Sequence, residues 1–270
     1  MTTQAELKHK KLFLLDMDGT IYIDNTLFDK TLDFLDYIKS VGGKYIFITN
    51  NSSKSVNDYI DKLQRMSIDV DLTNFLTSSQ ATAVFLQEKY PNKKIYVLGT
   101  ESLKTEFKNA NIKVTDKYEE DIDLLVAGFD TELVYQKLHD ACVLLLTKDV
   151  DFIATNPDLV CPTSFGSIPD CGSICRMLET ATGRAPFYVG KPNPMMIDMA
   201  IKKSGFTKDE TLVIGDRIYT DIASGLNAGV DAALVLSGET KLEDLKNFSQ
   251  KPDFIFKDIG ELLSVLLSSN

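Results

Sequence analysis

Residues 11–22 read KLFLLDMDGTIY and join an apolar run to two closely spaced carboxylates. The apolar residues 12–15 are followed by Asp16, Asp18 and Gly19. An apolar run this short, ended by a turn signal, predicts a buried strand. Two carboxylates at the end of a buried strand disfavour each other's charged form. The stretch therefore predicts a compensating positive charge from another part of the fold.

Short apolar runs of the same kind recur along the chain, with helical patterns between most of them. They begin at residues 11, 44, 94, 123, 151, 186, 211, 232 and 253. Strands that alternate with helices predict βαβ units and a parallel sheet that is covered on both faces. In the first helical pattern, Asp29 is the predicted N-cap and Gly42 the predicted C-terminal stop. The predicted fold class is α/β.

Polar clusters follow four of these predicted strands. They are DMDGT at 16–20, TNNSS at 49–53, Lys191 with Pro192, and DRIYTD at 216–221. In open α/β sheets, ligands bind at the carboxyl ends of the strands. The four clusters are therefore expected to form one site if their strands are neighbours.

The residue types in these clusters suit the binding of a phosphoryl group. Asp16, Asp18 and Asp216 form an oxygen set that suits magnesium, which would supply positive charge between them. Lys191 is a compact cation for a phosphate oxygen, and Thr49 with the amides after it can donate hydrogen bonds to another. An aspartate is then the natural covalent nucleophile, and a second aspartate can exchange a proton with the leaving oxygen and with water.

Each cluster taken alone has an ordinary structural explanation. A D-x-D sequence after a strand is often a turn or a helix cap, and TNNSS is a good loop and N-cap. Lys191 could be a surface lysine, and Asp216 and Asp221 could be loop charges favoured by a helix dipole. The functional interpretation depends on all four clusters falling at strand ends in one α/β pattern.

Composition excludes several other classes of protein. The net charge of -10 argues against a nucleic-acid partner, because phosphate backbones are bound by clustered Lys and Arg. The chain has two histidines, His9 and His139, so a multi-histidine metal site is not available. It has four cysteines and no C-x-x-C pair, and the polar start precedes no long apolar run. These features indicate a cytoplasmic protein with reduced thiols and no membrane partner.

Together, DMDGT, ITNNSS, GKPNP and VIGDRIYTDI resemble the four motifs of the haloacid dehalogenase-like (HAD) phosphatase superfamily, in the family's order. The TNN and GKP segments resemble the NagD-like, para-nitrophenyl-phosphatase-like branch, which carries a large α/β cap of type IIA. The resemblance spans residues 12 to 236. It implies a Rossmann-like parallel-sheet core with an inserted α/β cap domain, and magnesium-dependent hydrolysis of small phosphate monoesters.

The resemblance also implies a role for each acidic residue of the motifs. Asp16 would attack phosphorus, become an aspartyl phosphate and bind Mg²⁺ through its other oxygen. Asp18 would be the general acid and base, with its backbone carbonyl on the metal. Asp216 would complete the metal site. Asp221 would support it by orienting a metal-bound water or Lys191.

The remaining motif residues are implied to bind the substrate. Thr49 and Asn50 would hold phosphoryl oxygens, and Lys191 would neutralise the phosphate and the nucleophile. Asn51 would contact the substrate or only cap the loop. Asp18 separates this chain from the dehalogenases, which lack an acid at that position, and from the P-type ion pumps, which carry a threonine there.

Residues 54–189 separate the TNNSS and GKP motifs and are too long for a loop. We therefore predict a discontinuous core domain at 1–80 and 187–270, and a cap domain at 81–186. A cap that closes over the core would exclude water and select the leaving group. Members of this family often dimerise through the cap, so a homodimer is one implied partner. The segment 154–174 is expected where the cap faces the core.

The motifs do not specify which phosphate ester is bound. Nucleoside monophosphates, sugar phosphates and phosphoglycolate all stay open as the small phosphorylated metabolite. A phosphotransferase or mutase on the same fold is an alternative, in which a sugar hydroxyl replaces water. A non-catalytic binding domain is a second alternative, because fold does not imply function.

Overall fold

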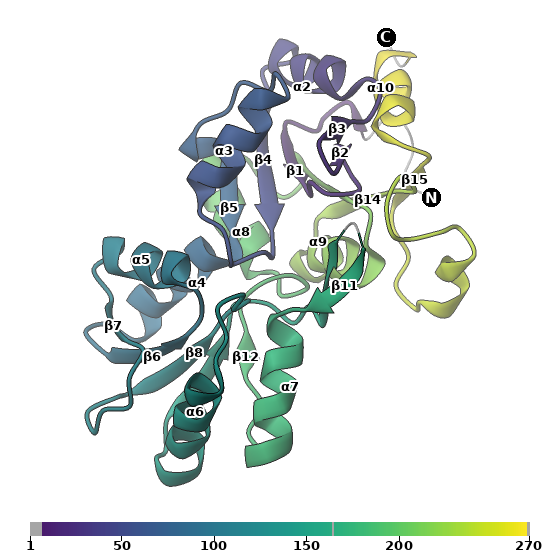
Figure 1. Cartoon of the computed structure of the whole chain (residues 1–270). Helices are drawn as coiled ribbons and strands as arrows, with labels where there is room; N and C mark the ends of the chain where they lie inside the picture. The colour runs from purple at the N-terminus through teal and green to yellow at the C-terminus, as the bar shows by residue number, and fades with distance from the viewer. Residues whose placement is uncertain (1–6, 164, 269–270) are drawn as a thin grey trace. The chain divides into compact units, whose positions relative to one another are not determined.

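The computed structural model describes residues 7–163 and 165–268, and the chain forms two compact units (Figure 1). Within the described residues, unit 1 takes in the chain up to residue 49, residues 56–76 and the chain from residue 191 onward. Unit 2 takes in residues 50–55 and 77–190. The core and cap boundaries given above stay a prediction.

Unit 1 is built on a six-stranded sheet with the strand order β15-β14-β13-β1-β4-β5. Its strands are β1 (Leu12–Leu15), β4 (Lys44–Thr49), β5 (Phe75–Thr77), β13 (Thr211–Gly215), β14 (Asp231–Val235) and β15 (Phe254–Phe256). The strand β1 lies between β13 and β4 and is parallel to both. The predicted parallel α/β fold is confirmed.

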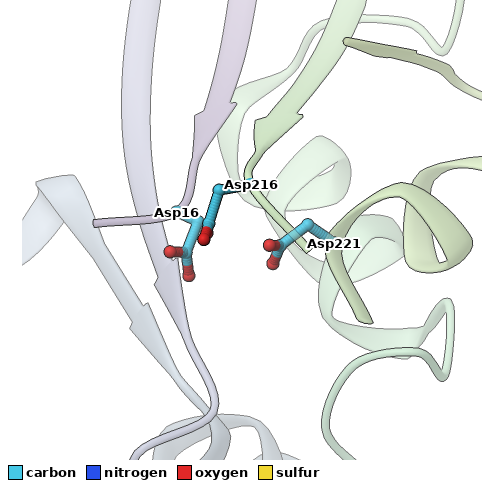
Figure 2. Close-up of side chains that lie close together, drawn as sticks. All are labelled: Asp16, Asp216 and Asp221. Atoms are coloured by element: carbon cyan, nitrogen blue, oxygen red, sulfur yellow. The ribbon is translucent and has the colours of Figure 1, made fainter. Parts of the chain in front are cut away.

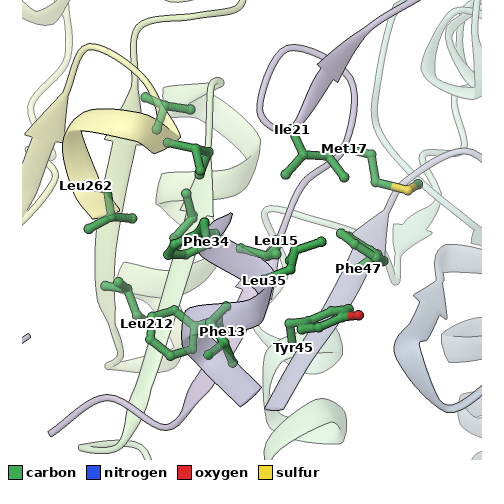
Figure 3. Close-up of a cluster of buried hydrophobic side chains, with 14 of the residues drawn as sticks. Phe13, Leu15, Met17, Ile21, Phe34, Leu35, Tyr45, Phe47, Leu212 and Leu262 are labelled. Carbon is green, nitrogen blue, oxygen red and sulfur yellow. The ribbon is translucent and has the colours of Figure 1, made fainter. Parts of the chain in front are cut away.

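The remaining elements of unit 1 are helices and one small hairpin. They are β2 (Tyr22–Ile23), β3 (Thr26–Leu27), α2 (Thr31–Ser40), α3 (Val56–Arg65), η1 (Leu72–Asn74), α8 (Met195–Ser204), η2 (Ile218–Ile222), α9 (Ala223–Ala228), η3 (Asp244–Asn247) and α10 (Ile259–Ser268). Phe13 and Leu15 of β1 pack in one core with Phe34 of α2 and Leu262 of α10 (Figure 3). The rings of Phe13 and Phe34 meet edge to face, with their centroids 5.7 Å apart.

All four residues of β1 are buried, although successive side chains of a strand point to opposite faces of the sheet. Both faces of the sheet are therefore covered at β1, as the continuous apolar run predicts. A strand buried in this way holds the residue that follows it in a fixed place.

The first helix begins one residue later than predicted, so Asp29 is not its N-cap. The N-cap of α2 is Lys30, which takes a left-handed backbone conformation with a φ of 66°. Thr31 is buried and its Oγ1 donates a hydrogen bond to the carbonyl of Ile21 at 3.0 Å. This buried bond fixes the start of the helix more strongly than an exposed aspartate could. Gly42, just beyond the helix end, has a φ of 72°, as a C-terminal stop requires.

Unit 2 has its own parallel sheet, with the strand order β12-β9-β8-β6-β7. Its elements are α4 (Ser78–Lys89), β6 (Lys94–Leu98), α5 (Glu101–Asn109), β7 (Lys113–Thr115), β8 (Leu124–Ala127), α6 (Tyr135–Thr147), β9 (Asp151–Ala154), β10 (Val160–Thr163), β11 (Gly166–Pro169), α7 (Cys171–Thr182) and β12 (Phe187–Tyr188). A separate core joins Tyr96 and Leu125 of the sheet to Leu144 of α6 and Leu178 of α7.

The segment 154–174 contains an antiparallel hairpin, in which β10 pairs with β11. Its position against the core stays a prediction. Among residues 7–163 and 165–268, no helix has both the length and the apolar character needed to cross a bilayer.

Candidate active site

Three of the polar clusters follow strands that are neighbours in the sheet of unit 1. Asp16 follows β1, Asp216 follows β13, and Thr49 is the last residue of β4. Because the three strands are adjacent and parallel, their carboxyl ends share one edge of the sheet. The backbone N–H of Asp16 continues the ladder by donating to the carbonyl of Ile214 at 2.9 Å. The expectation of neighbouring strands is confirmed for these three.

The fourth predicted strand is not part of this sheet. Its counterpart, β12, pairs with β9 in unit 2. The condition that the strands are neighbours is therefore not met for this strand. Lys191 nevertheless joins the same site, because it lies three residues beyond the end of β12 and is the residue at which the chain re-enters unit 1.

Three carboxylates meet at the shared edge of the sheet. Asp16, Asp216 and Asp221 each present a carboxylate oxygen, and these oxygens lie within 4.8 Å of one another (Figure 2). The side chain of Asp16 is 17 % exposed, whereas Asp216 and Asp221 are almost completely buried. Burial, and after it the neighbouring carboxylates, raise the pKa of Asp16 and of Asp216 above the usual range. The cluster therefore needs positive charge.

Lys191 supplies one positive charge from within the protein. Its Nζ donates to Asp16 Oδ1 at 2.8 Å, to Asp221 Oδ1 at 2.6 Å and to the carbonyl of Ile48 at 3.0 Å. Burial acts to lower the pKa of Lys191, but the two carboxylates outweigh it and hold this pKa above its ordinary value. The ammonium is therefore fixed beside Asp16 and stays charged.

Asp221 reaches the cluster through an unusual turn of helix. It lies in η2, a π-type turn in which the N–H of Ile222 donates to the carbonyl of Arg217 at 3.2 Å. The Oδ2 of Asp221 accepts a hydrogen bond from the backbone N–H of Arg217 at 3.1 Å. The motif resemblance implies only a supporting role for Asp221. The structure places it in contact with Lys191 and in the carboxylate cluster itself.

The carboxylate of Asp216 is held in a narrow space with one oxygen unpaired. Its Oδ2 accepts a hydrogen bond from the N–H of Glu239 at 2.6 Å, whereas its Oδ1 is buried and has no hydrogen-bond partner among the residues that the structure describes. A Cβ added at Gly19 or Gly238 would lie 2.6 Å or 2.0 Å from Asp216 Oδ2, so both positions require glycine.

An orphaned buried carboxylate oxygen beside two further carboxylates is a donor set that fits a hard divalent cation. Asp16 and Asp216 would hold it, in the way the motif resemblance implies. Asp221 is engaged by Lys191 and could contribute its second oxygen or orient a water.

Asp18 lies apart from the three clustered carboxylates. Its side chain is 66 % exposed, so it can meet a substrate from solvent. Its Oδ2 accepts a hydrogen bond from the hydroxyl of Tyr22 at 3.2 Å, and its Oδ1 lies 4.0 Å from the Nζ of Lys62. Metal binding through the backbone carbonyl of Asp18 stays a prediction. Neither Tyr22 nor Lys62 was a predicted site residue, although Tyr22 lies only four positions after Asp18.

The predicted substrate-binding residues 49–51 fall at a boundary between the units. Thr49 is a buried residue of unit 1, whereas Asn50 and Asn51 belong to unit 2. The Nδ2 of Asn50 donates to Asp158 Oδ2 at 2.7 Å, within unit 2. The Oδ1 of Asn51 accepts from the backbone N–H of Ser53 at 2.9 Å. Asn51 therefore caps the loop, which is one of the two roles considered for it. Contact between Asn51 and the substrate stays a prediction.

Three carboxylates and a buried lysine thus meet at one edge of the parallel sheet of unit 1. Comparisons with known proteins agree with the motif resemblance. Residues 13–113 match the family model described as haloacid dehalogenase-like hydrolase, and residues 188–262 match the model described as HAD-hydrolase-like.

Similar proteins match the chain over nearly its whole length. An acid sugar phosphatase of Staphylococcus haemolyticus is 35 % identical over 260 residues, which cover 96 % of this chain and 98 % of the relative. The crystal structure of a 4-nitrophenylphosphatase from Thermotoga maritima is 41 % identical, with a TM-score of 0.92 and coverage of 97 % and 99 %. NagD from Escherichia coli K-12 is 33 % identical, with a TM-score of 0.85 and coverage of 93 % and 98 %.

The chain belongs to the haloacid dehalogenase-like hydrolases, in their NagD-like, para-nitrophenyl-phosphatase-like branch. It is an enzyme, a phosphatase of this family, as the motifs predict. Phosphatases of this family generally use a divalent metal, and unit 1 carries an acidic cluster whose residue types suit one.

Proposed function

We propose that this enzyme hydrolyses small phosphate monoesters with Mg²⁺, through an aspartyl phosphate on Asp16. The observation that carries the proposal is the position of Asp16, which follows the central buried strand and shares one site with a buried lysine and two buried carboxylates. Magnesium, when bound, would neutralise charge on the phosphoryl oxygens and on the carboxylates.

Asp16 is the group that would attack phosphorus. A carboxylate oxygen of Asp16 forms the new O–P bond while the ester P–O bond breaks and the leaving oxygen takes the bonding electrons. Lys191, at 2.8 Å from Asp16 Oδ1, would also stabilise negative charge on the transferred group. Thr49 and Asn50 are the proposed donors to the phosphoryl oxygens.

Asp18 is the proposed acid and base. Its carboxyl proton passes to the leaving oxygen in the first step. In the second step the Asp18 carboxylate takes a proton from water, and that water attacks the aspartyl phosphate, releasing inorganic phosphate and restoring Asp16. The exposure of the Asp18 side chain supports this role, because the leaving group arrives from solvent.

Sugar phosphates are the proposed substrate class to test first. The support is the similarity to an acid sugar phosphatase, and the similarity to a 4-nitrophenylphosphatase supports the aryl ester as a probe. The cytoplasmic location, the absence of a nucleic-acid partner and a homodimer through the cap stay predictions.

Phosphate release from a panel of esters tests the proposal. The panel holds 4-nitrophenyl phosphate, several sugar phosphates, nucleoside monophosphates and phosphoglycolate, each with Mg²⁺ or with excess chelator. Wild type is compared with Asp16→Asn, and with Asp29→Asn as a control that alters an exposed aspartate of the same unit.

We expect magnesium-dependent release by the wild type and by Asp29→Asn, and background release by Asp16→Asn. Release that persists in Asp16→Asn would exclude Asp16 as the nucleophile. A folded wild type that releases phosphate from no ester, yet transfers it to an added sugar, would replace hydrolysis with phosphotransfer.

A further inference from the structure

The carboxylate of Asp18 is flanked by two side chains outside the recognised motifs. Tyr22 donates its hydroxyl to Oδ2 at 3.2 Å, and the ammonium of Lys62 lies 4.0 Å from Oδ1. The same ammonium lies over the ring of Tyr22, 3.8 Å from the ring centroid. Asp18, Tyr22 and Lys62 thus form one connected cluster within unit 1.

The two flanking residues are fixed by the fold. Tyr22 is completely buried and belongs to the hydrophobic core of unit 1. Its backbone carbonyl accepts a hydrogen bond from the N–H of Gly19 at 2.8 Å, which closes the loop that carries Asp18. Lys62 extends from α3, and its side chain is 21 % exposed. A cation over an aromatic face is attracted to it, so Lys62 and Tyr22 hold each other in place.

Asp18 itself is not held by packing, because 66 % of its side chain is exposed. An exposed carboxylate samples several rotamers unless polar contacts select one. Proton transfer to a leaving oxygen requires the acid within hydrogen-bond reach and correctly aimed. The orientation of Asp18 must therefore come from its polar neighbours.

We propose that Tyr22 is a positioning residue for Asp18, and that Lys62 supports it by holding the Tyr22 ring and facing the second carboxylate oxygen. The inference rests on the proposed function, since it assigns a role only if Asp18 exchanges a proton with the leaving group. Tyr22 and Lys62 take no part in bond formation themselves.

The test uses the dependence of the rate on the leaving group. An ester with a poor leaving group, such as a sugar phosphate, needs protonation of the departing oxygen. The 4-nitrophenolate ion departs readily without it. The value of kcat/KM reports the steps up to departure of the leaving group, so it isolates this proton transfer from the later hydrolysis of the aspartyl phosphate.

We expect Tyr22→Phe, which removes only the hydroxyl, to lower kcat/KM about tenfold for the sugar phosphate that the wild type cleaves best. For 4-nitrophenyl phosphate the expected loss is less than about twofold. A general structural defect would lower both values by the same factor.

One variant serves as a control, and two variants of Lys62 test its part in the proposal. Tyr45→Phe removes another buried hydroxyl of unit 1, which donates to the carbonyl of Asp69 at the same 3.2 Å, and it should leave both rates unchanged. Lys62→Met removes the ammonium but keeps an apolar stem over the ring, and it should show the same selective loss as Tyr22→Phe. Lys62→Arg keeps a cation that stacks on aromatic faces and should restore most of the rate on the sugar phosphate.

Equal losses on both esters, or no loss in either Tyr22→Phe or Lys62→Met, would overturn the positioning role while the proposed function stands. If Tyr22→Phe does not fold, Lys62→Met and Lys62→Arg decide the question alone. A wild type that cleaves neither ester would overturn the proposed function, and the positioning role with it.

Discussion

Replacing Lys191 by methionine should destabilise the protein by about 4 kcal/mol at pH 8 without metal. The ammonium of Lys191 contacts Asp16 at 2.8 Å and Asp221 at 2.6 Å, and both Lys191 and Asp221 are almost completely buried. Removing one partner of a buried ion pair costs about 3 to 5 kcal/mol, because the other charge is left without compensation. Here the buried carboxylate of Asp221 is left in that state, and Asp16 loses the same partner.

The size of this loss should depend on pH. Burial already raises the pKa of Asp16, and Lys191 opposes the rise. Without Lys191 the folded-state pKa of Asp16 lies still higher above its unfolded value of 3.8. A group with a raised folded-state pKa costs stability as the pH rises through the interval between the two values. In the wild type this pKa is about 8, so below pH 8 both proteins lose stability from Asp16 to the same extent, and the difference that this group makes between wild type and Lys191→Met should grow only above pH 8.

Urea unfolding in excess chelator, at several pH values, measures the effect. The matched control is Lys10→Met, because Lys10 is also buried but pairs with Asp231, which is 29 % exposed and can be hydrated. We expect the control to cost about 1 to 2 kcal/mol with little pH dependence. In a double-mutant cycle, Lys191→Met and Asp221→Asn should show a coupling energy of at least about 2 kcal/mol. A loss for Lys191→Met no larger than that of Lys10→Met would refute the reasoning.

Three further predictions concern the metal site and one half-buried acid, Glu106. Asp216→Asn should raise the metal concentration for half-maximal activity by at least about 100-fold, because it neutralises a buried carboxylate of the cluster. Gly238→Ala should cause a similar metal defect, since its Cβ would lie 2.0 Å from Asp216 Oδ2 and must displace it. Metal titration of the initial rate measures both. Burial raises the pKa of Glu106 from 4.5 to about 7, so the wild type should lose stability as the pH rises between these values. Glu106→Gln should lack this loss and be more stable at pH 8 by about 2 kcal/mol, measured by urea unfolding.

For each of these predictions, one result would contradict it. An unchanged metal requirement in Asp216→Asn would remove Asp216 from the metal site. Normal metal affinity in Gly238→Ala would mean that the Asp216 carboxylate can move without loss. A Glu106→Gln protein whose stability follows the pH dependence of the wild type would show that Glu106 is not the group that titrates.

Much of the fold and the centre of the site could be predicted because they depend on local signals. The run TLVIG became β13 with the predicted bounds, and the apolar residues 12–15 became β1. Once these runs are parallel neighbours, Asp16 and Asp216 must lie close together. The rule that ligands bind at the carboxyl ends of strands needs no knowledge of side-chain contacts.

Other features could not be predicted because their causes are distant in sequence or locally irregular. The strands β5 and β7 have three residues each, too few to show a period. The π-type turn that brings Asp221 to Lys191 has no ordinary helical spacing. The contact of Asn50 with Asp158 joins residues 108 positions apart, and the anchoring of α2 by Thr31 depends on a carbonyl that only the folded chain supplies.

The central position of β1 has a consequence for the synthesis of this protein. One edge of β1 pairs with β4, which follows soon after it, but the other edge pairs with β13, whose first residue is Thr211. At about 5 to 20 residues per second, a ribosome needs about 10 to 40 seconds to make the chain between them. During that time the apolar edge of Leu12–Leu15 has no native partner and is open to wrong pairing. Unit 2 is translated within the same interval, so all the strands of the second sheet are synthesised before the first sheet can close.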